Sequence, residues 1–517
     1  MPERRPDSCA AALWEGLCAA AAAAPHEASI QDGRGALTNA ELATAVGATA
    51  LRLRELVPAT SRVGVRLAPG VDQHVAVLGV LVAACVYVPF DVAWSAERTG
   101  YVCADAGVAL MVEDGAGPAG VRSVSLDRLG PDSVTVPDAT VPDLAAAVAR
   151  LDVTPAPPVY LMYTSGTTGA PKGVRTSWPA LRNRLEWMQD VHALGPRDTV
   201  LAKTSCGFDV SIWEFLWPRL RNARSSVLDV RAAGGWSALW DVLHDDRVTV
   251  CHFVPSVARS AMRDPNARPV PSLKLVALSG EVLDRHTAAR LQRLAPNARI
   301  VNMYGPTECA IDVSHWTFDP DEVWDPVPIG GGAANCVLTV SAPDGTPARR
   351  EGQLVISGVQ VADGYIGAAA GTGGFSSIGG LGPSYATGDI AVEVAPGVLS
   401  VVGRSDRQVK LNGVRVELDG LEAVVRGHPA IQDCAVLVDT DDRSPARVVA
   451  VCVPREPGAT PTTRSVRQFV RESSAIEDFA FRLVPVDRLP LTTSGKTDYL
   501  TLETYVRERS NDGQRTG

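Results

Sequence analysis

The stretch that decides the fold is rich in glycine and hydroxyl groups and reads Tyr163-Thr164-Ser165-Gly166-Thr167-Thr168-Gly169-Ala170-Pro171-Lys172-Gly173-Val174. It follows an apolar run over residues 159–162, which predicts a buried strand. Three glycines allow the backbone to turn tightly and to approach a ligand closely. Four serine and threonine hydroxyls, the backbone N–H groups and Lys172 offer hydrogen bonds and a positive charge. The stretch therefore predicts a polyphosphate-binding loop, although the Walker A spacing is absent.

Length and composition set the class of protein. A chain of 517 residues is too long for a single hydrophobic core, so two or more domains are expected. Hydrophobic residues at 46% and charged residues at 21% are typical of a soluble globular protein. A net charge of −9 argues against a nucleic-acid partner, which would favour a basic surface.

The cysteines and the N-terminal segment indicate the cellular compartment in which the protein is expected. Ten cysteines are scattered without a C-x-x-C pair, which indicates reduced thiols and neither a zinc site nor a disulfide framework. No apolar run approaches the roughly 20 residues that span a bilayer, so no membrane partner is expected. The alanine-rich stretch over residues 10–25 contains Trp14 and Glu15, and it predicts a helix and not a signal peptide. We therefore expect a cytoplasmic protein.

The first part of the chain alternates between strand and helix patterns up to about residue 150. A strand is predicted over residues 63–67 and a helix over residues 74–85. Such alternation is typical of parallel α/β layers. Residues 130–158 are richer in Pro, Asp and Val and predict a connector before the phosphate loop. After the loop, residues 178–192 predict a helix.

The later part of the chain carries two apolar strands and then changes character. The strands are predicted over residues 248–253 and 273–278. Residues 366–384 are rich in Gly, Ala and Ser and predict a mobile loop. From about residue 404 the pattern becomes a small α+β unit, with helices near 419–427 and 465–474 and strands near 432–438 and 447–453. The fold class predicted is α/β, with a large N-terminal domain of layered α/β subdomains (1–404) and a small mobile α+β C-terminal domain (405–517).

The phosphate loop resembles that of the adenylate-forming enzymes, which include the amino-acid adenylation domains of nonribosomal peptide synthesis, acyl-CoA synthetases and luciferases. More segments of the chain resemble motifs of this family and follow in the family's order. These segments are Leu37–Leu42, Tyr87–Asp91, Asn302–Glu308, Tyr385–Asp389, Gly403–Gly413 and Leu489–Lys496. Together the motifs extend from about residue 37 to residue 500, and the resemblance implies that the protein uses ATP and Mg²⁺.

The resemblance assigns a nucleotide site. It implies that Tyr304 stacks on adenine, that Asn302 reads the adenine edge and that Asp389 accepts hydrogen bonds from the ribose hydroxyls. Glu308 is implied as a catalytic residue and as the Mg²⁺ ligand, because it would bridge the metal and the ATP phosphates. The full set of implied ATP-binding residues is Thr164, Ser165, Gly166, Thr167, Thr168, Gly169, Lys172, Gly280, Asn302, Tyr304, Gly305, Thr307, Asp389 and Arg404.

The resemblance also places a catalytic cation and a hinge near the C-terminus. Lys496 is implied as the catalytic lysine that stabilises the charge developing when a carboxylate attacks the α-phosphate. Asp406 occupies the hinge position, where backbone rotation would swing the small domain and assemble the site.

The substrate pocket is implied position by position. Asp209 matches the residue that holds the α-ammonium group in amino-acid adenylating relatives, and it disfavours simple acids. The implied lining is Asp209, Val210, Trp213, His252, Ala277, Ser279, Met303, Ile311, Asp312 and Lys496. His252, Ser279 and Asp312 are expected to form a hydrogen-bonding set that rejects an apolar side chain. The pattern resembles that of serine-activating domains, with 2-methylserine, threonine and diaminopropionate as further candidates because Ala277 is small.

The partners expected are an amino-acid substrate and a phosphopantetheinylated carrier protein supplied in trans, because the chain is predicted to be a free-standing adenylation enzyme. The need for a small activating partner protein stays open. Two other functions remain alternatives. One is an acid–CoA ligase of the same superfamily, and the other is a non-catalytic nucleotide-binding relative.

Overall fold

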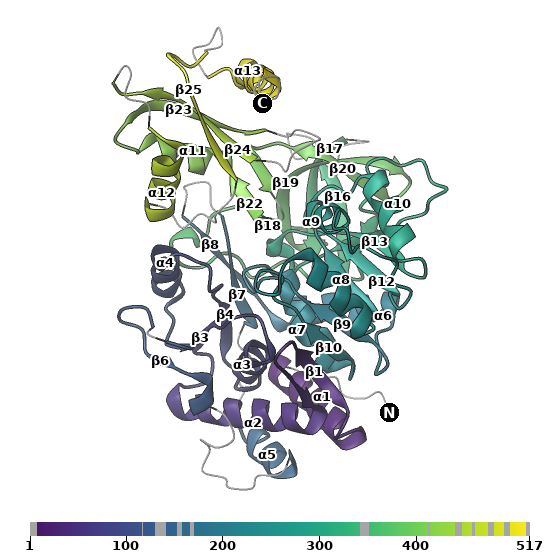
Figure 1. The fold of residues 1–517 in the computed structure, drawn as a ribbon. Coiled ribbons are helices and arrows are strands. Elements are labelled where there is room, and N and C mark those ends of the chain that lie inside the picture. Colours follow the sequence, from purple (N-terminus) through teal and green to yellow (C-terminus); the bar gives the residue numbers. More distant parts are fainter. Residues whose placement is uncertain are drawn as a thin grey trace. The chain divides into compact units, whose positions relative to one another are not determined.

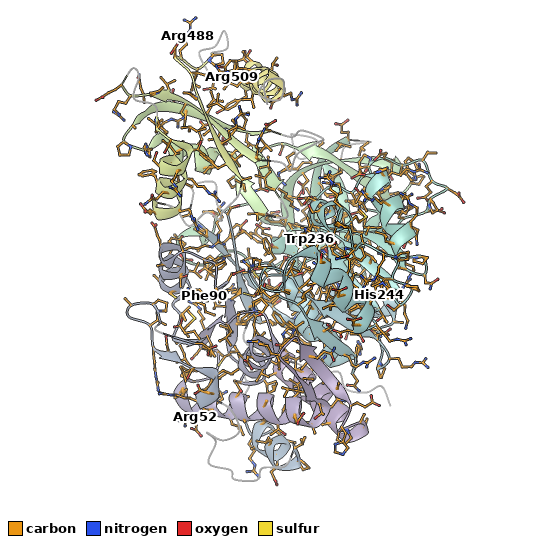
Figure 2. The ribbon with its side chains drawn as sticks, in the orientation of Figure 1. Arg52, Phe90, Trp236, His244, Arg488 and Arg509 are labelled. Atoms are coloured by element: carbon orange, nitrogen blue, oxygen red, sulfur yellow. The ribbon has the colours of Figure 1, made fainter. Side chains whose placement is uncertain are left out.

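The computed structural model describes residues 8–115, 117–129, 141–151, 158–165, 170–341, 351–411, 414–439, 447–456, 461–473, 480–490 and 497–512 (Figure 1). The chain divides into two compact units. The large unit comprises Met1–Ala93, Cys103–Tyr163 and Gly173–Ser405, and the small unit comprises Trp94–Val102, Thr164–Lys172 and Asp406–Gly517. In the large unit the side chain of Phe90 is fully buried, whereas that of Arg52 reaches the surface (Figure 2).

The largest sheet of the large unit has nine strands in the order β15-β14-β13-β12-β11-β9-β10-β1-β2. Its central strands are parallel and its two edges antiparallel. Parallel strands are covered on both faces, which explains why they read as continuous apolar runs. The bounds are β1 (Ala28–Asp32), β2 (Gly35–Thr38), β9 (Thr199–Ala202), β10 (Arg224–Val227), β11 (Val250–Phe253), β12 (Leu275–Leu278), β13 (Arg299–Tyr304), β14 (Ser314–Thr317) and β15 (Gly331–Gly332).

Two more sheets complete this part of the fold. A six-stranded sheet has the order β6-β5-β3-β4-β7-β8, and an antiparallel five-stranded sheet has the order β16-β17-β19-β18 with β20 paired to β19. Their bounds are β3 (Arg62–Arg66), β4 (Val86–Pro89), β5 (Leu110–Glu113), β6 (Ser123–Val124), β7 (Tyr160–Thr164), β8 (Lys172–Thr176), β16 (Cys336–Ser341), β17 (Glu351–Gly358), β18 (Phe375–Ile378), β19 (Gly382–Ala395) and β20 (Val398–Arg404).

The helices between these strands include those predicted from the sequence, and the helix predicted over 74–85 lies three residues earlier, as α3. The predicted helices over 10–25 and 178–192 are confirmed as α1 and α6, and Thr38 with Glu41 forms a capping box at the start of α2. The bounds are α1 (Cys9–Ala23), α2 (Asn39–Leu56), α3 (Val71–Val82), α4 (Ala96–Ala106), α5 (Val141–Val148), α6 (Trp178–His192), α7 (Val210–Leu220), α8 (Trp236–Asp245), α9 (Pro255–Ala261) and α10 (Arg285–Leu294).

Two predicted loops contain regular structure. Helix α5 lies inside the segment 130–158 that we expected to be a connector, and it buries Leu144 and Val148. The segment 366–384, for which the sequence predicts a mobile loop, contains strand β18, which pairs with β19, so it is not wholly irregular. Phe375 explains the difference, because its ring packs on Tyr365 and Tyr385 with ring centroids 5.1 and 4.9 Å away.

The small unit is a three-stranded sheet with helices, as the α+β pattern predicts. Alternate residues of its strands enter two apolar clusters, since side chains along a strand point to opposite faces. Val448 and Ala450 pack with α11 and α12, whereas Val449 and Val451 pack with α13. The bounds are β21 (Gln408–Leu411), β22 (Val414–Glu417), α11 (Leu418–Arg426), β23 (Ile431–Asp439), β24 (Arg447–Pro454), α12 (Thr463–Ser473), β25 (Phe481–Pro485) and α13 (Tyr499–Asp512).

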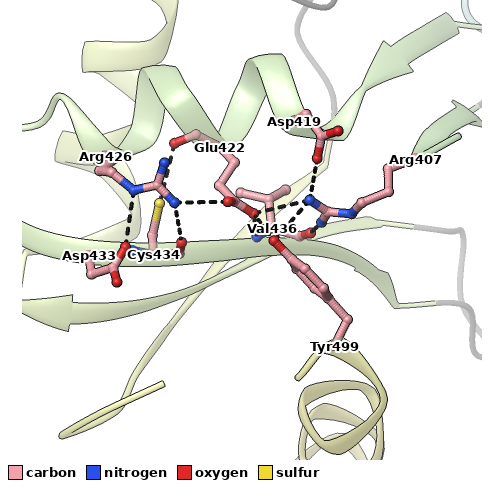
Figure 3. A network of polar contacts seen from close by, with 8 residues as sticks. All are labelled: Arg407, Asp419, Glu422, Arg426, Asp433, Cys434, Val436 and Tyr499. Carbon is pink, nitrogen blue, oxygen red and sulfur yellow. Dashed lines mark hydrogen bonds and ion pairs between the residues drawn. The ribbon is translucent and has the colours of Figure 1, made fainter. Parts of the chain in front are cut away.

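A polar network ties the elements of the small unit together (Figure 3). Arg407 contacts the carboxylates of Asp419 and Glu422 on α11 and donates to the backbone carbonyl of Val436 on β23. Its guanidinium also donates to the Tyr499 hydroxyl on α13 at 2.9 Å and lies 3.8 Å from the centre of that ring. The side chain of Arg407, the residue that follows Asp406, thus connects α11, β23 and α13.

Among the helices that the structure describes, none combines the length and the apolar character that crossing a membrane requires.

Candidate active site

One cluster of the large unit gathers three of the predicted nucleotide-binding residues. Tyr304 ends β13, while Asp389 and Arg404 face each other across β19 and β20. The Tyr304 hydroxyl and the Arg404 guanidinium both donate to the Asp389 carboxylate. Burial, followed by the nearby Asp389, raises the pKa of Tyr304 well above its usual value, so the phenol keeps its proton and acts as a donor. Asp389 is therefore held in one place by two donors, as a group that orients a ligand must be.

The turn after β13 explains the glycine at position 305. A side chain there would overlap the backbone oxygen of Ile311 and the α-carbon of Asp312. Ala310 and Ile311 have φ angles of 52° and 82°, which non-glycine residues rarely adopt. Such backbone strain is concentrated at functional sites. The strained turn carries Glu308 on one side and Asp312 on the other.

Glu308 is completely buried in this turn. Its carboxylate accepts a hydrogen bond of 2.6 Å from the Tyr365 hydroxyl, and its backbone oxygen accepts one of 2.9 Å from the Ala362 N–H. Burial and the Glu308 carboxylate raise the pKa of Tyr365, which keeps this phenol a donor. The described residues contain no group of three potential metal ligands. A single carboxylate fits Mg²⁺, which is bound by one or two carboxylates together with substrate phosphates.

Asn302 uses its amide nitrogen inside the protein. The side-chain NH₂ group donates to the backbone oxygens of Val327 and Pro328, each at 2.9 Å. If Asn302 contacts adenine, its amide oxygen would therefore accept the hydrogen bond. Gly280, another predicted nucleotide-binding residue, has a φ angle of 89° that favours glycine.

The predicted substrate-binding residues form a second cluster of the large unit. Trp213 is fully buried on α7, and its ring meets the ring of His252 edge-on with centroids 6.4 Å apart. His252 lies beside Ala277 in the register of β11 and β12, and its Nε2 is 2.9 Å from the Ser279 hydroxyl. Burial, with smaller contributions from Lys203 and Arg184, lowers the pKa of His252 well below its usual value. The imidazole is therefore neutral at physiological pH.

Asp209 stands at the N-terminal end of α7 and is half-buried. Burial and the Asp209 charge both raise the pKa of the fully buried Tyr160, which shows that the carboxylate is close to this phenol. Val210 follows Asp209 as the first residue of the helix and is half-buried as well.

Asp312 does not join His252 and Ser279 in the way that the sequence predicted. Its carboxylate forms an ion pair of 2.6 Å with Arg184 on α6, and the two side chains are 3% and 0% exposed. The Met303 sulfur lies 3.9 Å from the same guanidinium. Sequence reasoning missed Arg184, although Leu181, Arg184 and Met188 share one buried face of the predicted helix. A charged residue on that face was the available signal.

Other predicted site residues belong to the small unit or lie outside the described residues. Lys172 begins β8 and Thr164 ends β7, and Ser165 donates to the Arg415 backbone oxygen at 2.6 Å. The Asp406 carboxylate accepts from the Gln408 N–H at 3.3 Å. The predicted residues outside the described part of the chain are Gly166, Thr167, Thr168, Gly169 and Lys496.

Comparison with known families assigns the chain to a class. Residues 18–366 match the AMP-binding enzyme family, and residues 420–496 match the C-terminal domain of AMP-binding enzymes. The chain therefore belongs to the AMP-binding enzyme family and is an adenylate-forming ligase. The predicted fold class, α/β with a large N-terminal and a smaller C-terminal part, is confirmed.

Individual relatives refine this picture. Phosphinothricin tripeptide synthetase PhsB of Streptomyces viridochromogenes is 36% identical over 444 residues, which cover 83% of this chain and 36% of that protein. The chain thus spans about a third of this relative. The adenylation domain AlmE of Vibrio cholerae, solved with glycyl-adenosine-5′-phosphate, has the same fold with a TM-score of 0.81, 21% identity and coverage of 98% and 99% of the two chains. PA1221, a nonribosomal peptide synthetase protein containing adenylation and PCP domains, aligns with a TM-score of 0.78, 23% identity and coverage of 95% and 83%.

Proposed function

We propose that the protein activates an amino acid with ATP and then loads it onto a carrier protein. In the first step a carboxylate oxygen of the amino acid attacks the α-phosphorus, and the bond to the departing pyrophosphate breaks. In the second step the thiolate of a phosphopantetheine group attacks the acyl carbon, and AMP leaves. The observation that carries the proposal is the set of buried polar side chains formed by the His252–Ser279 and Arg184–Asp312 pairs, in the same unit as the Tyr304–Asp389–Arg404 cluster.

Asp209 favours an amino acid over a simple acid. Asp209 is a half-buried carboxylate at the N-terminal end of α7. Its negative charge would attract the α-ammonium group of an amino acid, a group that an aryl or fatty acid lacks. PhsB is named as a peptide synthetase, which agrees with this assignment.

The nucleotide roles follow from the chemistry of the residues. Asp389 would accept hydrogen bonds from ribose hydroxyls, with Tyr304 beside it to contact the base. Lys172 and the hydroxyls of the phosphate loop would bind the phosphates. Glu308 would hold Mg²⁺, which neutralises phosphate charge when bound. Lys496 would stabilise the negative charge that gathers at the α-phosphate.

The side-chain end of the pocket favours a small polar substrate. A substrate with an apolar side chain could not form a hydrogen bond with the His252–Ser279 pair. Such a substrate should therefore bind more weakly. We place L-serine first, and 2-methylserine, threonine and diaminopropionate behind it. AlmE was solved with the adenylate of another small amino acid, glycine.

The chain is proposed to work with a carrier protein in trans and to close around Asp406. We assign residues 1–404 to the core that binds ATP and amino acid, and residues 405–517 to a mobile subdomain that brings Lys496 to the site. PA1221 contains an adenylation and a PCP domain, which supports a carrier protein as the acceptor. The alternative of an acid–CoA ligase shares the first step and differs in the acceptor thiol.

Amino-acid-dependent ATP–pyrophosphate exchange tests the proposal. The panel comprises L-serine, D-serine, threonine, 2-methylserine, diaminopropionate and benzoate, with Lys496→Ala and Asp209→Asn as controls. We expect exchange with L-serine that is lost in both variants. Exchange with benzoate alone would move the enzyme to the acid–CoA ligase branch, and ATP binding without exchange on any acid would point to a non-catalytic relative.

A further inference from the structure

Asp312, one of the implied substrate-binding residues, forms a buried ion pair with a residue that the sequence motifs do not include. Arg184 on α6 and Asp312 in the strained turn are 0% and 3% exposed, and their contact is 2.6 Å. Arg184 lies outside every motif that suggested the nucleotide and substrate sites. Its position is nevertheless fixed, because Asp312, Met188 and Met303 all contact the same guanidinium.

The histidines near this pair are neutral, although other charges also act on them. Burial lowers the pKa of His252, His192 and His315, and Arg184 contributes to each of these shifts. Lys203 also acts on His252, and Arg299 acts on the other two histidines. Asp312 is a carboxylate in direct contact with Arg184. A substrate side chain next to this pair would meet a polar surface on which the charges of Arg184 and Asp312 offset each other.

Several buried polar atoms of Arg184 and of the implied substrate-binding residues have no hydrogen-bond partner among the described residues. They are Nε of Arg184, Nδ1 of His252 and Nε1 of Trp213. Buried polar atoms nearly always have partners, so water or a ligand would supply the partners of these three atoms. An arginine Nε and an indole nitrogen can only donate, and they therefore suit an oxygen acceptor.

We infer that Arg184 is a specificity-determining residue, which neutralises Asp312 so that the pocket selects an uncharged, oxygen-bearing side chain such as a hydroxyl. This inference rests on the proposed amino-acid activation and narrows its substrate class. It ranks L-serine, threonine and 2-methylserine above diaminopropionate, because a second ammonium group would face the Arg184 charge. It also ranks them above L-aspartate, because a carboxylate would compete with Asp312 for the same guanidinium.

The test exchanges the charge of the pair and measures kcat/KM for pyrophosphate exchange with L-serine, L-alanine, L-diaminopropionate and L-aspartate. Arg184→Met leaves Asp312 unpaired, so the preference should move toward diaminopropionate by roughly 10–100-fold. Asp312→Asn leaves Arg184 unpaired, so the preference should move toward aspartate to a similar extent. Arg184→Lys keeps the charge and should keep serine ahead of diaminopropionate.

Two further variants keep the test decisive. Arg182 lies on the same helix and pairs with Glu186 at 2.9 Å near the surface, so Arg182→Met should leave every ratio unchanged. The double variant Arg184→Met with Asp312→Leu removes both charges, and replacement of a whole buried pair by apolar residues is well tolerated. In this variant the ratio of serine to alanine should fall, although not to one, because the His252–Ser279 pair remains. This measurement stands even where the single variants do not fold.

The outcomes separate this inference from the proposed function. Equal losses for all four amino acids in the single variants, or a wild-type ratio of serine to alanine in the double variant, would overturn the role of Arg184. A wild-type enzyme that prefers diaminopropionate or aspartate would overturn it too, while amino-acid activation would stand. No exchange with any amino acid would overturn the proposed function and this inference with it.

Discussion

Two arginines of this protein are held in opposite ways. Arg184 in the large unit is 0% exposed, and among the described residues its carboxylate partner is Asp312. Arg407 in the small unit is 28% exposed and shares its charge among Asp419, Glu422 and Tyr499 (Figure 3). The charge of Arg184 is confined to one buried ion pair. The charge of Arg407 is shared among partners on several elements that are partly exposed to solvent.

The difference teaches what each arrangement is suited to do. Removing one partner of a buried pair leaves an uncompensated charge, which costs about 3–5 kcal/mol. A buried pair is therefore a weak source of stability but a sensitive determinant of which charges can enter the site. A network near the surface tolerates the loss of one member, because solvent and the remaining partners compensate. Arg407 thus connects elements of the small unit. Arg184 determines which charged substrate side chains the proposed site of the large unit accepts.

The largest effect is expected from breaking the buried pair. Arg184→Met should lower the free energy of unfolding by about 3–5 kcal/mol, whereas adding Asp312→Leu should restore it fully or raise it by about 1–4 kcal/mol. Urea unfolding followed by tryptophan fluorescence measures this, because nine of the ten tryptophans belong to the large unit. A double variant that is less stable than Arg184→Met would show that the pair is needed for packing.

The next effect is a loss of stability of the large unit in acid. Burial lowers the pKa of His74 from 6.5 to about 3 and lowers that of His252 well below 6.5. Between these values the unfolded chain binds more protons than the folded chain, so the free energy of unfolding falls as the pH falls below about 6.5. At pH 5 the loss is roughly 2 kcal/mol for a histidine shifted as His74 is.

Urea midpoints between pH 7.5 and 5 check this prediction. His428 is the one histidine of the small unit and is partly buried, and this unit has no tryptophan after residue 405, so His428→Gln should leave the pH dependence of tryptophan fluorescence unchanged. A midpoint that stays constant over this pH range would mean that the buried histidines carry no such shift.

A smaller effect is expected from the hub of the network. Arg407→Ala removes hydrogen bonds to two carboxylates, a carbonyl and a phenol, and should destabilise the small unit by about 1–3 kcal/mol. Amide hydrogen exchange along β23 measures it, since this unit has no tryptophan after residue 405. Arg407→Lys should recover only part of the loss, because lysine lacks the planar fork. Unchanged exchange in β23 would contradict the connecting role.

The smallest effect is expected at the rim of the same network. Asp419 is 63% exposed, so Asp419→Asn should cost less than about 1 kcal/mol, and the effect should shrink further in high salt. The same exchange measurement applies. A loss as large as that of Arg407→Ala would show that the network depends on this exposed pair and does not share the charge.

Part of the fold and of the site was predictable because its signals are local. The helix over 178–192 agrees with α6 to the residue, since apolar periodicity and a proline at its start act over short range. Strand β18 was missed because Phe375 is a single aromatic residue in a glycine-rich segment, and its contacts with Tyr365 and Tyr385 come from other parts of the chain. Tertiary packing outweighed composition there.

The sequence by itself determined the family, the α/β class and the residue types available to the site, because motif spacing and hydrophobic period are properties of the chain. The tertiary structure alone decided which of these residues meet. Asp312 pairs with Arg184, which lies 128 positions away, and not with the His252–Ser279 pair. The physical reason is that a buried carboxylate requires the nearest cation in space, and no local pattern in the chain reveals which cation that will be.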